Sequence, residues 1–430
     1  DALESNTTGE SNTSLGTLSM SANTMGNNNT AIGRSAMLES EQTYSCTAVG
    51  AYALSKNQAD GNTAIGKSAL ENNTSGGDNI ALGISALGSN TIGIRNISVG
   101  AYTLVSNISG NKNVAVGSGA LLSNQSGSEN VAIGNNALGL NETGVNNTAL
   151  GSLALNKNIG SDNSAIGKNA LYVNTTGVDN TSVGVNSLNS NTSGSSNVAI
   201  GNNAGNTIIT GNNNTIIGGD ANVASSTISN ASAIGHAAVV GASNCIVLGG
   251  TGSAQVKVGI GVSAPATDFE IKQDDVSGTE RGIKLERQDN TDDWRLFIGG
   301  ASDLVLAYNN VTVGTFNPGT GNYVASSDAR LKKDIQPLSD ILQKVLQLQP
   351  KSYQFIADAN QTKSIGFIAQ EVEPLFPEIV NEREDGIKGL AYDEFSVIAI
   401  QAIKEQQAMI TQQQALINQL LQRVQALEQK

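Results

Sequence analysis

The pentad Asn-Val-Ala-Ile-Gly at residues 130–134 decides the fold of the first half of the chain. Its aliphatic residues, Val131 and Ile133, alternate with small ones, which is the two-residue period of a β-strand. Small residues in the alternate positions let a second backbone approach closely. The pentad therefore predicts a short strand with one aliphatic face and one face of small residues.

The same phrase recurs along the chain at a nearly constant spacing, which indicates a repeat architecture. Most steps are 17 residues, two are 16, and the last is 14. A further apolar residue usually follows four positions later, as at Leu121, Leu138 and Leu155. This pattern predicts a solenoid over residues 1–250 whose stacked coils bury a ladder of Ile and a ladder of Leu. The final glycines of the phrase are Gly16, Gly33, Gly50, Gly66, Gly83, Gly100, Gly117, Gly134, Gly151, Gly167, Gly184, Gly201, Gly218, Gly235 and Gly249.

The residues between the strands are mostly Asn, Thr, Ser and Gly, which favour turns and left-handed backbone conformations. Some of them form Asn-X-Ser/Thr sequons, for example at Asn73 and Asn191, which could accept glycans. We expect them instead to be turn residues of the repeat, with Asn capping the loops. Coils this short enclose little core, so the small residues predict lateral association with other copies, as in a trimer.

The pentads resemble the head repeats of trimeric autotransporter adhesins. This resemblance covers more than half of the chain, and it implies a trimeric left-handed parallel β-roll. The repeat of 17 residues is longer than the unit of that family, a departure that concerns the loops and not the stacking.

The composition argues against several other classes of protein. The 430 residues include 48 Gly but only 6 Pro, and glycine does not recur every third residue, so collagen is excluded. A net charge of −13 argues against a nucleic-acid partner. No run reaches the ~20 apolar residues that a membrane helix needs, so we expect no membrane insertion.

The residues that could carry redox or metal chemistry are few. Two cysteines, Cys46 and Cys245, are far apart and do not suggest a disulfide scaffold. The single histidine, His236, excludes a His-based triad or a multi-His metal site. We therefore expect no cofactor and no metal. The chain begins in mid-pattern without Met, so we also expect an upstream anchoring domain to be missing from it.

Residues 251–327 predict a β-rich connector or distal tip domain. All six prolines occur from Pro265 onward, and strand-like alternations occur at residues 294–298 and 304–308. The only tryptophan, Trp294, lies here, and with Tyr308 and Tyr323 it could bind a receptor glycan. The alternative is that Trp294 packs in the core of a trimer.

The charge density rises at Ser327, where a different kind of domain begins. Residues 327–430 hold 14 acidic and 11 basic side chains. They contain, in order, Ser-Asp-Ala-Arg-Leu-Lys-Lys-Asp-Ile at 327–335, Leu-Gln-Pro-Lys-Ser-Tyr at 348–353, Gly-Phe-Ile-Ala-Gln-Glu-Val at 366–372 and Phe-Pro-Glu-Ile-Val at 376–380. This series resembles the C-terminal intramolecular chaperone domain of phage tail spikes and fibres, a self-cleaving peptidase family whose module also occurs in the myelin regulatory factor family. The resemblance implies an α+β chaperone domain over residues 328–430.

The resemblance also implies a cut between Ser327 and Asp328, with Ser327 and Lys332 as the catalytic pair. Serine–lysine pairs are an accepted variant of nucleophile activation, but the lysine must lose its proton. Burial or a cationic neighbour, here Arg330 or Lys333, would favour that loss. Attack of Ser327 on its own carbonyl would close a strained small ring, so attack through water or on a neighbouring chain are the alternatives. The expected activity is a single-turnover, self-cleaving serine endopeptidase and nothing else.

The last part of the chain predicts a coiled-coil helix from about residue 395 to 430. Apolar residues recur every seven positions at Ile403, Ile410, Ile417 and Val424. Ile and Leu in this arrangement favour two strands by the simple rule, whereas the resemblance implies three.

Together these features predict a mainly β, homotrimeric phage tail fibre or spike in the virion tail, which attaches to a host surface glycan or protein receptor. Its C-terminal domain would drive trimerisation and folding and then remove itself. The alternative is a bacterial cell-surface trimeric adhesin that uses the same chaperone domain. A carbohydrate-degrading spike is disfavoured, because that chemistry needs paired carboxylates and the repeat offers few acids.

Overall fold

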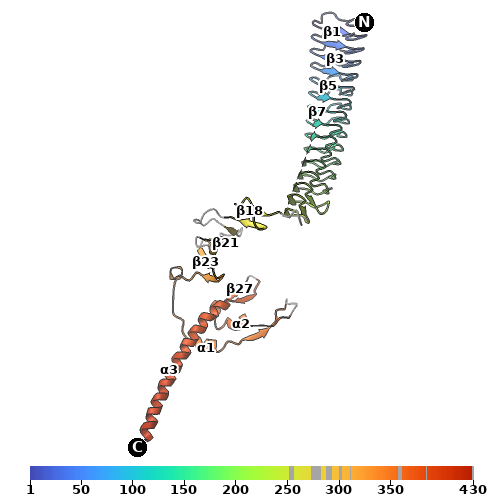
Figure 1. Cartoon of the computed structure of the whole chain (residues 1–430). Coiled ribbons are helices and arrows are strands. Elements are labelled where there is room, and N and C mark those ends of the chain that lie inside the picture. Colours follow the sequence, from blue (N-terminus) through green and yellow to red (C-terminus); the bar gives the residue numbers. More distant parts are fainter. Residues whose placement is uncertain are drawn as a thin grey trace. The chain divides into compact units, whose positions relative to one another are not determined.

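The computed structural model describes residues 1–250, 256–272, 282–286, 293–299, 303–309, 311–356, 361–383 and 385–428. The chain forms two compact units, residues 1–278 and 279–430 (Figure 1). The fold is mainly β, with a parallel β-solenoid, few helices and one long C-terminal helix, as the sequence predicts.

Fifteen strands of three residues, one per coil, form a single parallel sheet along the first unit (Figure 1). Each strand pairs with the equivalent residues of the next coil, so Val131 lies opposite Thr148 and Ile133 opposite Leu150. The strands are β1 (Thr13–Leu15), β2 (Thr30–Ile32), β3 (Thr47–Val49), β4 (Thr63–Ile65), β5 (Ile80–Leu82), β6 (Ile97–Val99), β7 (Val114–Val116), β8 (Val131–Ile133), β9 (Thr148–Leu150), β10 (Ser164–Ile166), β11 (Thr181–Val183), β12 (Val198–Ile200), β13 (Thr215–Ile217), β15 (Ser232–Ile234) and β17 (Ile246–Leu248). Two short strands, β14 (Asn222–Val223) and β16 (Val239–Val240), pair beside it.

The core of the solenoid is built from alanine and leucine. Ala132, Ala137 and Leu138 are fully buried, and their equivalents are buried in most other coils. Ile133, in contrast, is 39% exposed. The predicted leucine ladder is therefore confirmed, but the predicted burial of the isoleucine ladder is wrong.

The physical reason is the size of the coil. A ring of 17 residues encloses too little space for two files of large side chains, so the strand turns its small residue inward and its aliphatic residues outward. The small residues thus fill the coil interior, and a lateral contact between copies would fall on the exposed aliphatic file. Its exposed members include Leu15, Ile65, Leu82, Ile133, Leu150, Ile166, Ile200, Ile217, Ile234 and Leu248.

Stacked asparagines pair with one another through much of the coil interior. The Asn90 side chain donates to Asn73 Oδ1 at 2.7 Å, and the Asn107 side chain donates to Asn90 Oδ1 at 2.7 Å. Buried polar groups need such partners, because an unpaired one costs free energy. Asn73 and Asn191, the two sequon asparagines singled out above, are both fully buried. They are structural residues of the repeat, because a folded coil does not present them to a glycosylating enzyme.

Beyond the solenoid the described chain forms one short parallel pair of strands and then an antiparallel sheet. A parallel pair, β18 (Val258–Ile260) and β19 (Phe269–Ile271), ends the described part of the first unit. The second unit begins with a five-stranded sheet of β20 (Ile283–Glu286), β21 (Asp293–Ile298), β22 (Leu304–Tyr308), β23 (Val311–Phe316) and β24 (Tyr323–Ala325). Strands β21 and β22 coincide with the two alternating stretches predicted from the sequence.

The rest of the second unit mixes short helices and hairpins, as expected for residues 328–430. Its helical elements are the 3₁₀ turns η2 (Ala329–Leu331), η3 (Pro377–Ile379) and η4 (Tyr392–Glu394) and the helices α1 (Ile341–Val345), α2 (Ala369–Val372) and α3 (Phe395–Glu428). Its strands are β25 (Lys351–Tyr353), β26 (Ser364–Gly366), β27 (Val380–Glu382) and β28 (Lys388–Leu390), which form two hairpins. A small core holds them together, with Ile341, Val372, Phe376, Ile379, Ile398 and Ala402 buried.

Helix α3 matches the predicted helix from about residue 395. Its seam residues Ile403, Ile410, Ile417 and Val424 are between 48% and 63% exposed in the single chain. An exposed heptad seam indicates a helix that associates with others of its kind. Among the described residues, no helix combines the length and apolar character needed to cross a membrane.

Candidate self-cleavage site

The candidate site follows directly on strand β24. Ser326, the residue after that strand, is fixed to β23: its N–H donates to Val313 O at 2.8 Å, and its hydroxyl donates to Thr312 O at 2.8 Å. The chain upstream of the predicted cut is therefore held by the sheet up to Ser326.

The structure brings the predicted catalytic pair together. Lys332 Nζ donates a hydrogen bond to Ser327 Oγ at 2.9 Å. The 3₁₀ turn η2 lies between them and folds the chain back, and its last bond runs from Lys332 N–H to Ala329 O at 3.1 Å. A local turn therefore places a potential base beside a potential nucleophile, which is the contact that serine activation requires.

Asp328, on the far side of the predicted cut, forms the cap of the same turn. Its carboxylate accepts from the Arg330 backbone N–H at 2.9 Å and from the guanidinium of Arg330 at 3.0 and 2.6 Å. Hydrogen bonds from the Arg330 side chain hold the pKa of the Asp328 carboxyl below its ordinary value. Because its charge is paired with Asp328, Arg330 is a poor source for the cationic field at Lys332 that the sequence suggested.

Both members of the predicted catalytic pair are exposed in the single chain. Beside them lies a shallow hollow of about 410 Å³, which is lined by Ser326, Ser327, Asp328, Arg330 and Leu331. A lysine becomes a base more readily when it is removed from water. Removal from water at this place requires a surface that the single described chain does not supply.

A second anchor holds the chain downstream of the cut. Glu405, on α3, accepts the backbone N–H groups of Ile341 at 3.2 Å and Leu342 at 2.7 Å, at the start of α1. The amide of Gln401 also donates to it, at 3.0 Å. The segment that contains the cut is thus tied to the β-sheet at Ser326 and to the long helix at Ile341. No local sequence pattern indicates this clamp, because its partners are more than 60 positions apart.

The clamp predicts a pH-dependent stability of the C-terminal domain. The hydrogen bond from Leu342 N–H, followed by that from Gln401, lowers the pKa of Glu405. A carboxyl with a lowered folded-state pKa stabilises the fold above its unfolded pKa, and this contribution is lost as the pH falls through the folded pKa. We expect Glu405→Gln to unfold at a lower temperature than the natural chain at pH 7, and the difference to shrink towards pH 3. Circular dichroism melts at both pH values measure this, with Glu428→Gln, on the same helix, as the control. An equal difference at both pH values would contradict the clamp.

The residues predicted for receptor binding lie on the β20–β24 sheet. Trp294 and Tyr308 are directly paired across β21 and β22, with ring centroids 5.2 Å apart. Tyr323 contacts Phe316 instead, with centroids 5.2 Å apart. The structure therefore brings Trp294 and Tyr308 into contact, whereas Tyr323 contacts Phe316, which is not among the residues predicted from the sequence.

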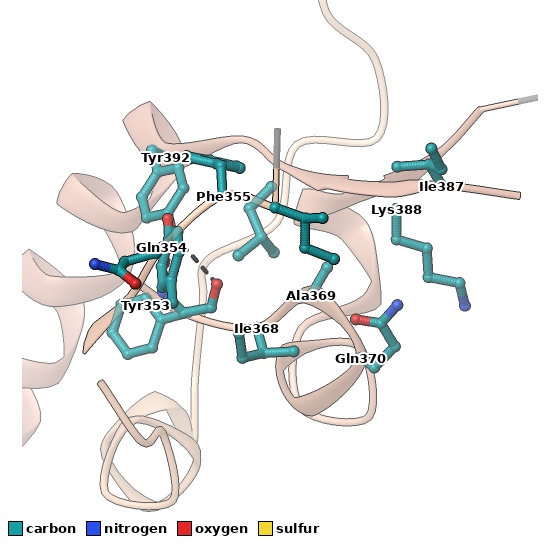
Figure 2. Close-up of a pocket in the computed structure, with 12 residues that line it drawn as sticks. Tyr353, Gln354, Phe355, Ile368, Ala369, Gln370, Ile387, Lys388 and Tyr392 are labelled. Atoms are coloured by element: carbon teal, nitrogen blue, oxygen red, sulfur yellow. Dashed lines mark hydrogen bonds between the residues drawn. The ribbon is translucent and has the colours of Figure 1, made fainter. Parts of the chain in front are cut away.

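The C-terminal domain also has a larger pocket that the sequence did not predict. It has a volume of about 630 Å³ and lies between β25, α2 and β28 (Figure 2). The Tyr392 hydroxyl accepts the backbone N–H of Phe367 at 2.9 Å and approaches Gly366 closely, where a side chain would collide with it. The Gly366-Phe367 pair belongs to one of the motifs quoted above, so the signal was present in the sequence but had no assigned role. Among the described residues, no group of three or more His, Cys, Asp or Glu side chains could hold a metal ion.

Comparison with known families finds one match in the C-terminal part of the chain. The model of the family described as chaperone of endosialidase matches residues 327–381, so the match begins at Ser327. No curated protein matches the chain. A β-solenoid followed by this domain fits a tail fibre with a C-terminal chaperone domain, and the resemblance predicted from the sequence is confirmed over the matched residues. The family implies formation of a trimer, and it suggests a phage-tail or extracellular fibre with a self-cleaving, peptidase-like chaperone domain.

Proposed function

We propose that the chain is a subunit of a trimeric host-attachment fibre whose C-terminal domain assembles three chains and then cuts itself off between Ser327 and Asp328. The observation that carries this proposal is the 2.9 Å hydrogen bond between Lys332 Nζ and Ser327 Oγ, at the first residue of the family match. Residues 1–327 are the lasting fibre, and residues 328–430 are the assembly device.

The reaction is the hydrolysis of one peptide bond in each chain. The bond between the Ser327 carbonyl carbon and the Asp328 nitrogen breaks, and one water is added, which leaves a carboxylate on Ser327 and an amine on Asp328. Deprotonated Lys332 accepts the Ser327 hydroxyl proton when that oxygen acts. Attack on the serine's own carbonyl would close a four-membered ring, so Ser327 acts through a water molecule or on a neighbouring chain.

Assembly and cutting are linked in this proposal by the exposure of the catalytic pair. Ser327 and Lys332 face solvent in the single chain, and association of three chains supplies the surface that excludes water from them. Parallel strands that pair across separate coils fold slowly and expose their edges meanwhile, so a device that holds three chains in register benefits this fibre. Cutting after registration removes the device once it is no longer needed.

Mass spectrometry of the purified, expressed chain tests the proposal directly. We expect two products in equal amounts, one ending at Ser327 and one beginning at Asp328, which N-terminal sequencing identifies. A single intact mass in an assembled trimer would contradict the proposed cut, and a cut at another bond would contradict the assigned residues.

A further inference from the structure

One side of the β20–β24 sheet is apolar from edge to edge. Directly paired residues share a side of a sheet, and the pairing places Leu285 opposite Trp294 and Trp294 opposite Tyr308. We call this side the apolar face. Its exposed members are Ile283, Leu285, Trp294, Leu296, Ile298, Tyr308, Val311, Phe316 and Tyr323.

The opposite side of the same sheet is covered and carries charges. Asp293 and Arg295 are only 6% and 9% exposed, and their side chains pair at 3.1 Å. Lys284 pairs with the same carboxylate at 3.2 Å. An antiparallel sheet with one solvated face normally turns its polar side to water and its apolar side to the core. Here the covered side holds these charges together with the buried Val305 and Ala307, while the exposed side is apolar. An exposed apolar side indicates that another surface completes the apolar face.

The size of this face is close to what an interface needs. Five strands spaced ~4.8 Å apart and on average about five residues long give a face on the order of 300–400 Å². This area is comparable with the largest apolar patch on a typical monomeric protein, and such patches often mark interaction sites. A patch of this size on a fibre in water favours aggregation unless it is covered.

We propose that the apolar face packs against the same face of the other two copies in the trimer, and that this contact stays in the fibre after the cut. This inference rests on the self-association in the proposed function. The nine exposed members carry no charge and no amide, and their only polar side-chain groups are two Tyr hydroxyls and the indole N–H of Trp294, so the face suits a mainly apolar partner. Identical apolar faces are complementary to one another, and the family match implies three copies. The sheet ends at Ala325, two residues before the cut, so it remains with residues 1–327.

Tryptophan fluorescence tests this contact, because Trp294 is the only tryptophan of the chain. Trp294 is 42% exposed in the single chain. In the assembled natural protein we expect blue-shifted emission and acrylamide quenching several-fold weaker than in the chain unfolded by guanidinium. Analytical ultracentrifugation of the same sample establishes separately whether the chain is a trimer.

Two substitutions on opposite sides of the sheet supply the control. Leu285→Asp lies on the apolar face, on the edge strand β20, and Val324→Asp lies on the other side, on the edge strand β24. These side chains are 68% and 54% exposed, so neither substitution disrupts a core. We expect Leu285→Asp to restore strong quenching of Trp294 and Val324→Asp to leave it protected.

The outcomes separate this inference from the proposed function. A trimer that cuts itself but leaves Trp294 as accessible as in the Leu285→Asp variant overturns the inference alone, and its free apolar face would then be open to a receptor. A trimer in which both variants expose Trp294 equally also overturns it. A chain that does not associate at all overturns the proposed function as well.

Discussion

Replacing Ser327 with alanine is expected to leave a single full-length chain on a denaturing gel, where the natural chain gives two shorter products. The substitution removes the oxygen that accepts the hydrogen bond from Lys332. Loss of the nucleophile in such a pair lowers the rate by on the order of 10⁴-fold or more, so no cut should be seen over days. The readout is the fraction of intact chain after expression and after prolonged incubation.

The neighbouring serine provides a matched control for this experiment. Ser326→Ala changes the same residue type one position outside the pair, and this variant should still be cut, because the Ser326 backbone N–H keeps its hydrogen bond to Val313 O. A Ser327→Ala chain that is cut at the natural rate would show that the serine is not the nucleophile. Loss of cutting in both variants would point to damage to the local turn instead of the loss of a catalytic group.

The Lys332→Arg variant tests whether Lys332 accepts a proton from Ser327 or only places a positive charge beside it. Arginine keeps the positive charge but does not give up its proton in proteins. We expect the Lys332→Arg chain to form trimers and to remain intact, like Lys332→Ala. Efficient cutting by Lys332→Arg would mean that a positive charge beside Ser327 is sufficient.

Mixed trimers then separate the two routes to the carbonyl. Tagged Ser327→Ala chains, co-expressed with natural chains, are cut in the mixed trimer if a serine reaches across to a neighbour. They stay intact if each serine acts through water on its own chain. The ratio of cut to intact tagged chain therefore shows whether Ser327 acts on a neighbouring chain or through water on its own chain.

The sequence predicted the solenoid because each coil repeats the same residue pattern, so the spacing of the pattern gives the length of one coil. It predicted the wrong side of the strand to face inward, since alternation alone does not say whether the aliphatic or the small residues are buried. Burial of Ala132 and exposure of Ile133 follow from the volume of a 17-residue coil, a three-dimensional constraint. The left-handed backbone conformation of the buried leucines, such as Leu138 at φ 50°, could not be predicted from the sequence either, because leucine has no local preference for it.

The candidate site was predictable in part for a related reason. Ser327 and Lys332 are five residues apart, so a single turn suffices to join them, and the motif order pointed to both. Glu405 and the pocket around Tyr392 are assembled from distant segments and have no local signature. For Trp294 the sequence left two roles open, and the pairing across β21 and β22 places it on the apolar face for which we propose a contact between copies.

Replacing Gly134 with alanine is expected to break the solenoid in its middle. Gly134 has a φ of 140°, which residues with a side chain rarely adopt. A Cβ there would lie 2.6 Å from the carbonyl carbon of Gly151 in the next coil, a rigid backbone atom. Backbone strain and overpacking together should cost about 3 kcal/mol or more per chain. Each coil is stabilised mainly by its neighbours, so the stack should separate into two weaker halves.

Thermal unfolding and limited proteolysis of the fibre measure this effect. We expect Gly134→Ala to unfold at a clearly lower temperature and to be cleaved by added protease near its middle coils. Gly241→Ala is the matched control, because a Cβ at Gly241 has nothing within 4 Å and its φ is not positive. That variant should behave like the natural chain. If the two variants unfold alike, the contact between glycine backbones is not what sets the spacing of the coils. The recurrence of glycine at this position would then require another explanation, such as the need for a sharp turn within each coil.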